Sequence, residues 1–196
     1  MIYQTQRGQA IPTLVQVEAE RRKLDRRSHR RRAWSTFLLS FLVTFMGGLL
    51  ILLMFLPVLE VSGSSMEPTL RDGDILILLR PGTIGYGEMC GMYAQGRLIL
   101  KRVIGLPGDV VDMDAAGNVY VNGLPLREPY VAHKAVGTCD LNFPYTVPEN
   151  SLFVLGDHRE TSIDSRSNLI GCIETSQVMG QVVARIWPPK SIGWVN

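Results

Sequence analysis

One long apolar segment near the amino terminus interrupts an otherwise mixed pattern of hydrophobic and polar positions. Ala33 to Phe55 contains 23 residues without a charge, and the next charge is Glu60. A helix of that length spans about 34 Å at ~1.5 Å per residue, which exceeds the ~30 Å hydrocarbon core of a bilayer. The pattern predicts one transmembrane helix over residues 33–56.

A cleavable targeting signal is the alternative interpretation of this segment. Such a signal has an apolar region of about 7–15 residues, with small residues at a cleavage site just after it. Here the run is longer and continues into Leu56-Pro57-Val58-Leu59-Glu60. We therefore expect a retained anchor.

Beyond the anchor, the pattern changes to short apolar runs separated by turn residues such as Pro107-Gly108-Asp109. Runs of this length, bounded in this way, are typical of strands. No long segment of 3.6-residue period follows residue 56, so residues 57–196 are predicted to be mainly β. The expected strands are Ile75 to Leu79, Leu98 to Ile104, Val110 to Met113, Val119 to Val121, Phe153 to Leu155 and Val182 to Trp187.

Charge is distributed unevenly along the chain. Residues 1–33 carry nine Lys or Arg against three Asp or Glu, a balance of +6, and the rest has a balance of −4. A basic run can bind nucleic acid or form a solvated arm. Directly before an apolar span it is typical of a cytoplasmic flank. We expect residues 1–32 to be a cytoplasmic arm at a cell membrane, with membrane lipid and not nucleic acid as partner, and residues 57–196 to be extracytoplasmic.

The three cysteines, Cys90, Cys139 and Cys172, are widely separated, and no CxxC pair occurs. This spacing gives no support to a metal site, and we expect neither metal nor cofactor. In an oxidising compartment one disulfide could form, which would leave one thiol free. Three buried unpaired cysteines are the alternative, and the sequence leaves both open.

A candidate nucleophile, Ser65, follows shortly after the anchor, in Ser64-Ser65-Met66-Glu67-Pro68-Thr69-Leu70. About nine residues separate it from Phe55, and at no more than ~3.3–3.6 Å each they reach some 30 Å. Ser65 is therefore expected close to the bilayer surface.

A candidate base, Lys101, lies inside the apolar run from Leu98 to Ile104. In a strand it shares a face with Ile99 and Val103, and apolar neighbours lower the pKa of a lysine. Bringing that pKa from ~10.4 to between 7 and 8 costs roughly 4 kcal/mol. A neutral Lys101 could accept the Ser65 proton. The other lysines, Lys23, Lys134 and Lys190, have no such surroundings.

The stretches around Ser65 and Lys101 are followed by a third segment, Gly156-Asp157-His158-Arg159-Glu160-Thr161-Ser162-Ile163-Asp164-Ser165-Arg166. In order and spacing, the three resemble the motifs of type I signal peptidases. The resemblance runs from about Val61 to Trp187. It implies a membrane-bound serine endopeptidase that removes signal peptides from exported preproteins. It also implies an antiparallel β-sheet catalytic domain with a second lobe of variable size, which we expect at about residues 122–150.

The resemblance implies roles for single residues. Ser65, directly before the methionine, matches the nucleophile, Lys101 the general base, and Ser162 the serine that orients the lysine. Three further residues match positions that hold the active-site loops, namely Asp157, Asp164 and Arg166. Arg102, on a buried strand, needs a carboxylate partner. Asp157 is the first choice, and Asp164 with Arg166 is the next pair.

Two features of the motifs leave alternatives. His158 suggests a Ser-His-Asp arrangement, but neighbours in an extended chain point to opposite sides and the family commonly has a polar amide here, so we do not expect a catalytic histidine. Some family members carry an oxyanion-hole serine two positions before the nucleophile, where this chain has Gly63. Beside the Ser65 N–H, the second donor is left open among Ser62, Ser64 and a backbone N–H.

The family accepts small side chains at the first and third positions before the cut, in shallow apolar pockets. The expected lining residues are Val61, Met66, Leu70, Ile75, Ile99 and Leu100.

Other functions with the same residues are a specialised conjugation-system or organellar peptidase, a Ser/Lys self-cleaving regulator, and a membrane-tethered binding module. The regulators carry a DNA-binding helix-turn-helix, and residues 33–55 are too apolar for one. Ser65, Lys101 and Ser162 together argue against lost activity.

Overall fold

The computed structural model describes residues 34–51, 56–80 and 82–195. The chain divides between Leu52 and Leu53 into two units.

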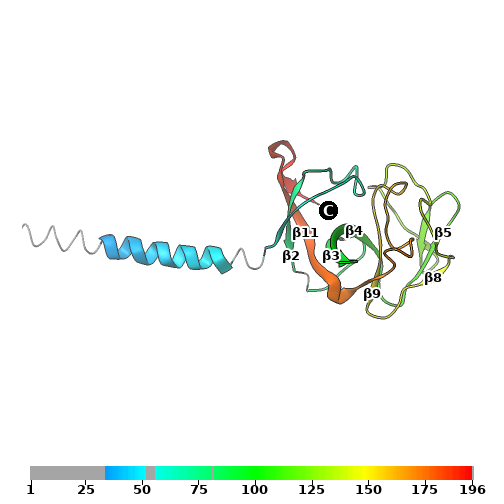
Figure 1. Cartoon of the computed structure of the whole chain (residues 1–196), viewed down its shortest axis with the longest axis horizontal. Coiled ribbons are helices and arrows are strands. Elements are labelled where there is room, and N and C mark those ends of the chain that lie inside the picture. Colours follow the sequence, from blue (N-terminus) through cyan, green and yellow to red (C-terminus); the bar gives the residue numbers. More distant parts are fainter. Residues whose placement is uncertain (1–33, 52–55, 81, 196) are drawn as a thin grey trace, which may run out of the picture. The chain divides into compact units, whose positions relative to one another are not determined.

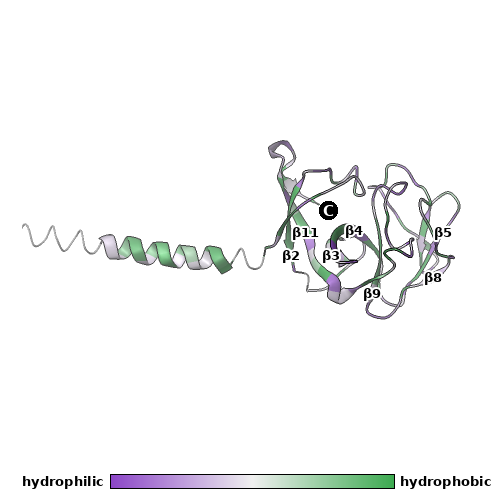
Figure 2. Cartoon of the chain, viewed as in Figure 1, coloured by the Kyte–Doolittle hydropathy of each residue, from purple (hydrophilic) through white to green (hydrophobic). Residues whose placement is uncertain are grey.

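The first unit contributes the helix Trp34–Ile51, which among the described residues is the one long and apolar enough to cross a membrane. Its large hydrophobic side chains are exposed, and Figure 2 shows it green along much of its length. A helix that is apolar around most of its surface suits a lipid environment. The expected arm at 1–32, and the expected span at Ala33 and at 52–55, lie outside the described residues.

The second unit consists of two antiparallel sheets (Figure 1). The larger sheet has the order β1 (Val58–Glu60), β2 (Ile75–Leu79), β11 (Val178–Trp187), β3 (Met89–Ala94), β4 (Arg97–Gly105), β9 (Ser151–Leu155) and β10 (Ile173–Glu174), with β12 (Gly193–Trp194) paired to β11. The smaller sheet has the order β7 (Leu124–Pro125), β6 (Val119–Val121), β5 (Val110–Met113) and β8 (Tyr145–Thr146). Two short 3₁₀ turns, η1 (Thr175–Gln177) and η2 (Pro189–Ser191), precede and follow β11. The prediction of a mainly β, antiparallel fold is confirmed.

Buried and more exposed side chains alternate along the strands, and the buried ones form the core. In β2, Leu76 and Leu78 are fully buried while Ile75 and Ile77 are only partly so, because successive side chains of a strand point to opposite faces. Leu76 and Leu78 pack with Met66 and Leu70 of the preceding loop in one apolar cluster. The loop that carries Ser65 is therefore anchored on the larger sheet.

The two sheets share a second apolar cluster, in which Ile104 of β4 and Phe153 of β9 pack with Val111 of β5. A Cβ at Gly105 would lie 2.8 Å from Val111 Cγ2, so glycine permits this close approach. The smaller sheet begins at Val110, ahead of the stretch 122–150 expected to form the second lobe, because the hairpin β5–β6 supplies its two central strands.

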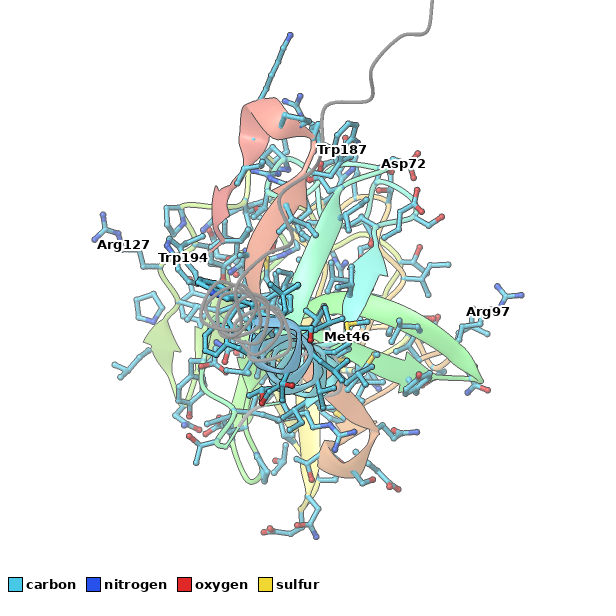
Figure 3. The ribbon with its side chains drawn as sticks, turned by 90° about the vertical axis from the view of Figure 1, so that its left-hand side faces the viewer. Met46, Asp72, Arg97, Arg127, Trp187 and Trp194 are labelled. Carbon is cyan, nitrogen blue, oxygen red and sulfur yellow. The ribbon has the colours of Figure 1, made fainter. Side chains whose placement is uncertain are left out.

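Several large or charged side chains project from the surface of this unit. Figure 3 shows Arg97, at the tip of the β3–β4 hairpin, and Arg127 pointing away from the ribbon. Trp187 and Trp194 are also exposed, at 51% and 82%.

Candidate active site

Ser65 lies on the loop between β1 and β2 and is partly buried. The loop turns tightly, with the Glu67 N–H donating to the Ser64 carbonyl at 3.0 Å and the Leu70 N–H to the Met66 carbonyl at 2.9 Å. Met66 and Leu70 reach into the core. These buried neighbours fix the backbone that carries the serine hydroxyl.

Lys101 lies on β4 opposite Cys90 of β3. It is 4% exposed, and its Nζ donates to Ser162 Oγ at 3.1 Å. Burial lowers the pKa of Lys101 to about 8, although the nearby Asp164 carboxylate opposes this effect. The sequence-based expectation of a buried lysine of low basicity agrees with this environment.

Ser65 and Lys101 line the same cleft of about 220 Å³. Four of the six residues expected to form the substrate pocket also line it, namely Val61, Met66, Ile99 and Leu100. The other two, Leu70 and Ile75, do not line this cleft. Leu70 is fully buried in the core beneath the loop, and Ile75 lies on β2 between Glu60 and Trp187. Leu59 and Leu98, which the sequence analysis missed, complete the apolar lining.

Arg102 and Asp157 form a buried ion pair with two hydrogen bonds, Nε to Oδ1 at 2.8 Å and Nη2 to Oδ2 at 2.7 Å. Asp157 also accepts a bond from Thr69 Oγ1 at 2.5 Å. The pair expected from the sequence is present, and it joins β4, the loop after β9 and the serine loop.

Asp164 and Arg166, the second expected pair, are fully buried and doubly hydrogen-bonded at 2.8 Å. Asp164 also accepts the Gly156 N–H at 3.0 Å. Ser162 lies between these groups, with its N–H bonded to the His158 carbonyl at 3.0 Å. The loop thus presents the Ser162 hydroxyl to Lys101.

His158 does not form a Ser-His-Asp arrangement. Its backbone N–H donates to the Ser65 carbonyl at 3.1 Å, while its side-chain Nδ1 is buried without a hydrogen-bond partner. Asp157 and Asp164 are both bonded to arginines.

A third buried ion pair, Arg159 with Glu128, was not predicted. Arg159 lies within the third motif, Gly156 to Arg166. Its partner lies 31 residues earlier, and no local pattern marks it.

Cys90, Cys139 and Cys172 are all unpaired in the structure. Burial raises the pKa of Cys90 to about 12, so its thiol is unreactive at neutral pH. In the part of the chain that the structure describes, no group of three His, Cys, Asp or Glu residues is placed to hold a metal ion.

A serine hydroxyl and a buried lysine of lowered pKa in one cleft define the class of Ser/Lys hydrolases. Comparison with known proteins narrows the class. Residues 31–187 match the family model described as signal peptidase, peptidase S26. The chain therefore belongs to the S26 signal peptidase family, and the resemblance inferred from its motifs is confirmed.

Two curated relatives support this family assignment. Signal peptidase I from Bacillus licheniformis is 38% identical over 139 residues, which cover 61% of this chain and 70% of the relative. Signal peptidase I from Streptococcus pneumoniae is 30% identical over 173 residues, covering 68% of this chain and 83% of the relative. A solved signal peptidase I from Enterococcus faecalis is 29% identical, covers 50% of this chain and 96% of its own, and has a TM-score of 0.44.

Proposed function

We propose that this enzyme removes signal peptides from exported preproteins, with Ser65 as nucleophile and Lys101 as general base. The observation that carries the proposal is the shared cleft, in which a lysine that is 4% exposed and has a pKa of about 8 lies with a serine on a well-anchored loop. Near neutral pH a useful fraction of such a lysine is unprotonated, which general-base catalysis requires.

The reaction proceeds in two stages. Neutral Lys101 takes the Ser65 proton as Oγ attacks the scissile carbonyl, and the resulting ammonium then gives a proton to the leaving amine. The acyl-enzyme is hydrolysed by a water that Lys101 deprotonates, and Ser65 regains its proton on release. Ser162, as a hydrogen-bond partner of Nζ at 3.1 Å, orients the lysine in both stages.

The tetrahedral intermediate needs hydrogen-bond donors at its oxyanion. The Ser65 N–H is one. The Gly63 N–H is already bonded to Asp72 Oδ1 at 2.7 Å, and Ser64 is not among the residues that line the cleft, whereas Ser62 is. These observations favour the Ser62 hydroxyl as the second donor.

Strand edges support binding of an extended peptide. β4 pairs with β3 along Arg97–Arg102 but with β9 only from Arg102 onward. Among the described residues, no strand pairs with the second edge of Leu98–Leu100, and that segment lines the cleft together with Leu59 and Glu60 of β1. An open edge accepts a further strand by main-chain hydrogen bonds, with pockets for alternate side chains. The apolar walls suit the small residues that precede a signal peptide cut.

For topology, we propose that the helix Trp34–Ile51 is the core of a single span, with residues 1–32 cytoplasmic and the β-rich unit extracytoplasmic. The +6 balance of residues 1–33 supports this orientation, because basic flanks stay on the cytoplasmic side. Protease added to intact spheroplasts should digest the β-rich unit and spare the arm. Protection of the β-rich unit would reverse the assignment.

The activity is tested with the purified full-length protein in detergent, a preprotein substrate and sequencing of the product's new amino terminus. We expect one cut, after the signal peptide. Ser65→Ala should abolish the cut, and Ser64→Ala is the matched control that should retain it. Full activity of Ser65→Ala would show that another nucleophile acts.

A further inference from the structure

The backbone of Gly156 packs closely against two residues of the site, Ser65 and Ser162. A Cβ at this position would collide with Ser162 Oγ and lie 2.5 Å from the Ser65 carbonyl oxygen. Both polar groups of Gly156 are held. Its N–H donates to Asp164 Oδ2 at 3.0 Å, and its carbonyl accepts a bond from Arg159 Nε at 3.2 Å. Any movement of this peptide changes the spacing of Ser65 and Ser162.

Arg159 is itself fixed by Glu128. Both side chains are 0% exposed, and both terminal nitrogens of the guanidinium donate to the Glu128 carboxylate. A buried charge whose partner is removed is strongly unfavourable, because no water compensates it. Glu128 therefore determines where the Arg159 guanidinium lies, and Arg159 in turn holds the Gly156 carbonyl.

The segment that carries Glu128, residues 128–136 between β7 and β8, contacts the other two buried arginines of the site as well. The ring centroid of Tyr130 lies 3.9 Å from Arg102 Cζ. The Val136 carbonyl accepts a bond from Arg166 Nη1 at 2.6 Å. No residue of this segment lines the cleft of Ser65 and Lys101. Its contacts therefore reach the chemistry indirectly, through β4 and the loop after β9.

We propose that Glu128 is a positioning residue for the hydrolysis: acting through Arg159, it holds the Gly156 peptide and thereby fixes Ser65 and Ser162 relative to Lys101. The proposal rests on the Ser65/Lys101 dyad of the proposed function, and adds to it a residue outside the cleft and outside the three motifs.

Removing the Glu128 carboxylate, and with it the restraint on Arg159 and Gly156, has two consequences. The alignment of Ser65, Lys101 and Ser162 loosens, which lowers the rate of the chemical step because small misplacements of reacting groups cost rate steeply. Water also gains access to Lys101, which is 4% exposed. Because burial is the main cause that lowers its pKa, hydration moves that pKa upward. The acid limb of the pH–rate profile then shifts to higher pH.

The test compares Glu128→Gln with Glu149→Gln, which removes an exposed carboxylate from the turn between β8 and β9. Full-length variants are assayed in detergent on a preprotein. For Glu128→Gln we expect kcat to fall about tenfold with KM within about twofold of the original, and the acid limb to move up by about half a pH unit. Glu149→Gln should leave all three unchanged. A folded Glu128→Gln with the original kcat and acid limb overturns the proposal.

A double variant, Glu128→Leu with Arg159→Met, separates positioning from stability. Replacing a buried ion pair by apolar side chains of similar volume preserves stability in many proteins, but here it removes the bond to the Gly156 carbonyl. The proposal predicts a melting temperature near the original together with the same loss of kcat and shifted limb. Original kinetics in this variant, or failure of both variants to fold, would show that the pair contributes to stability alone. Ser65→Ala, assayed in parallel, tests the dyad independently: its activity would refute the dyad whatever the Glu128 variants do.

Discussion

Lys101 Nζ and Ser162 Oγ lie 3.1 Å apart although 61 residues separate them in the chain. The bond joins the middle of β4 to the loop that follows β9. Both residues are buried, Lys101 at 4% and Ser162 at 1% exposure. The Ser162 hydroxyl thus lies where it can orient the proposed base.

Removing this hydroxyl should misalign the base. In Ser162→Ala, Lys101 remains buried but its Nζ loses the hydrogen bond to the Ser162 hydroxyl, so we expect kcat to fall by about 10–100-fold with KM little changed. Steady-state cleavage of a preprotein measures both. Ser176→Ala, at an exposed position of η1, is the control. An unchanged kcat in Ser162→Ala would show that packing alone orients Lys101.

The second oxyanion donor is tested at Ser62. Ser62→Ala should lower kcat by about 100-fold, within the range found when one oxyanion-hole donor is removed. Ser64→Ala, which changes the neighbouring serine outside the cleft, should have little effect. If Ser64→Ala proves the more damaging of the two, the assignment of the donor is wrong.

The Arg102–Asp157 pair is predicted to stabilise the β-rich unit. Arg102→Ala leaves the Asp157 carboxylate, 1% exposed, without its guanidinium, and breaking a buried pair in this way costs roughly 3–5 kcal/mol. Denaturant unfolding followed by tryptophan fluorescence measures the change. Arg97→Ala is the matched control, since Arg97 points into solvent at a hairpin tip (Figure 3). Equal stability of the two variants would contradict a structural role for the pair.

The sequence predicted the strands whose apolar runs are continuous, and the buried lysine with them. β4 is the clearest case, because Lys101 interrupts a run that no solvated strand would contain. β3 was missed. Its sequence includes Gly91, which weakens a strand pattern, but glycine leaves room there for the Leu78 side chain, whose Cδ2 would lie 2.7 Å from a Cβ.

The sequence likewise predicted some of the buried ion pairs and missed another. Asp157 and Asp164 could be paired with arginines because they stand in motifs with known spacing. Glu128 could not, because it stands in a loop and meets Arg159 only through the packing of residues 128–136 on the larger sheet. Leu70 was expected to line the cleft but is buried in the core, for a related reason. Apolar residues near a site point either into the cleft or into the core, and composition does not distinguish the two.

The most direct test of the Ser65/Lys101 dyad is the pH dependence of kcat/KM for the intact enzyme. A general base must be unprotonated, so activity rises with pH through the pKa of the free enzyme's base. The pKa of Lys101 is lowered by burial to about 8. We therefore predict an acid limb with its midpoint near pH 8, and no activity at any pH in Lys101→Arg, whose guanidinium stays protonated. An acid limb near pH 10, or normal cleavage by Lys101→Arg, would contradict the dyad.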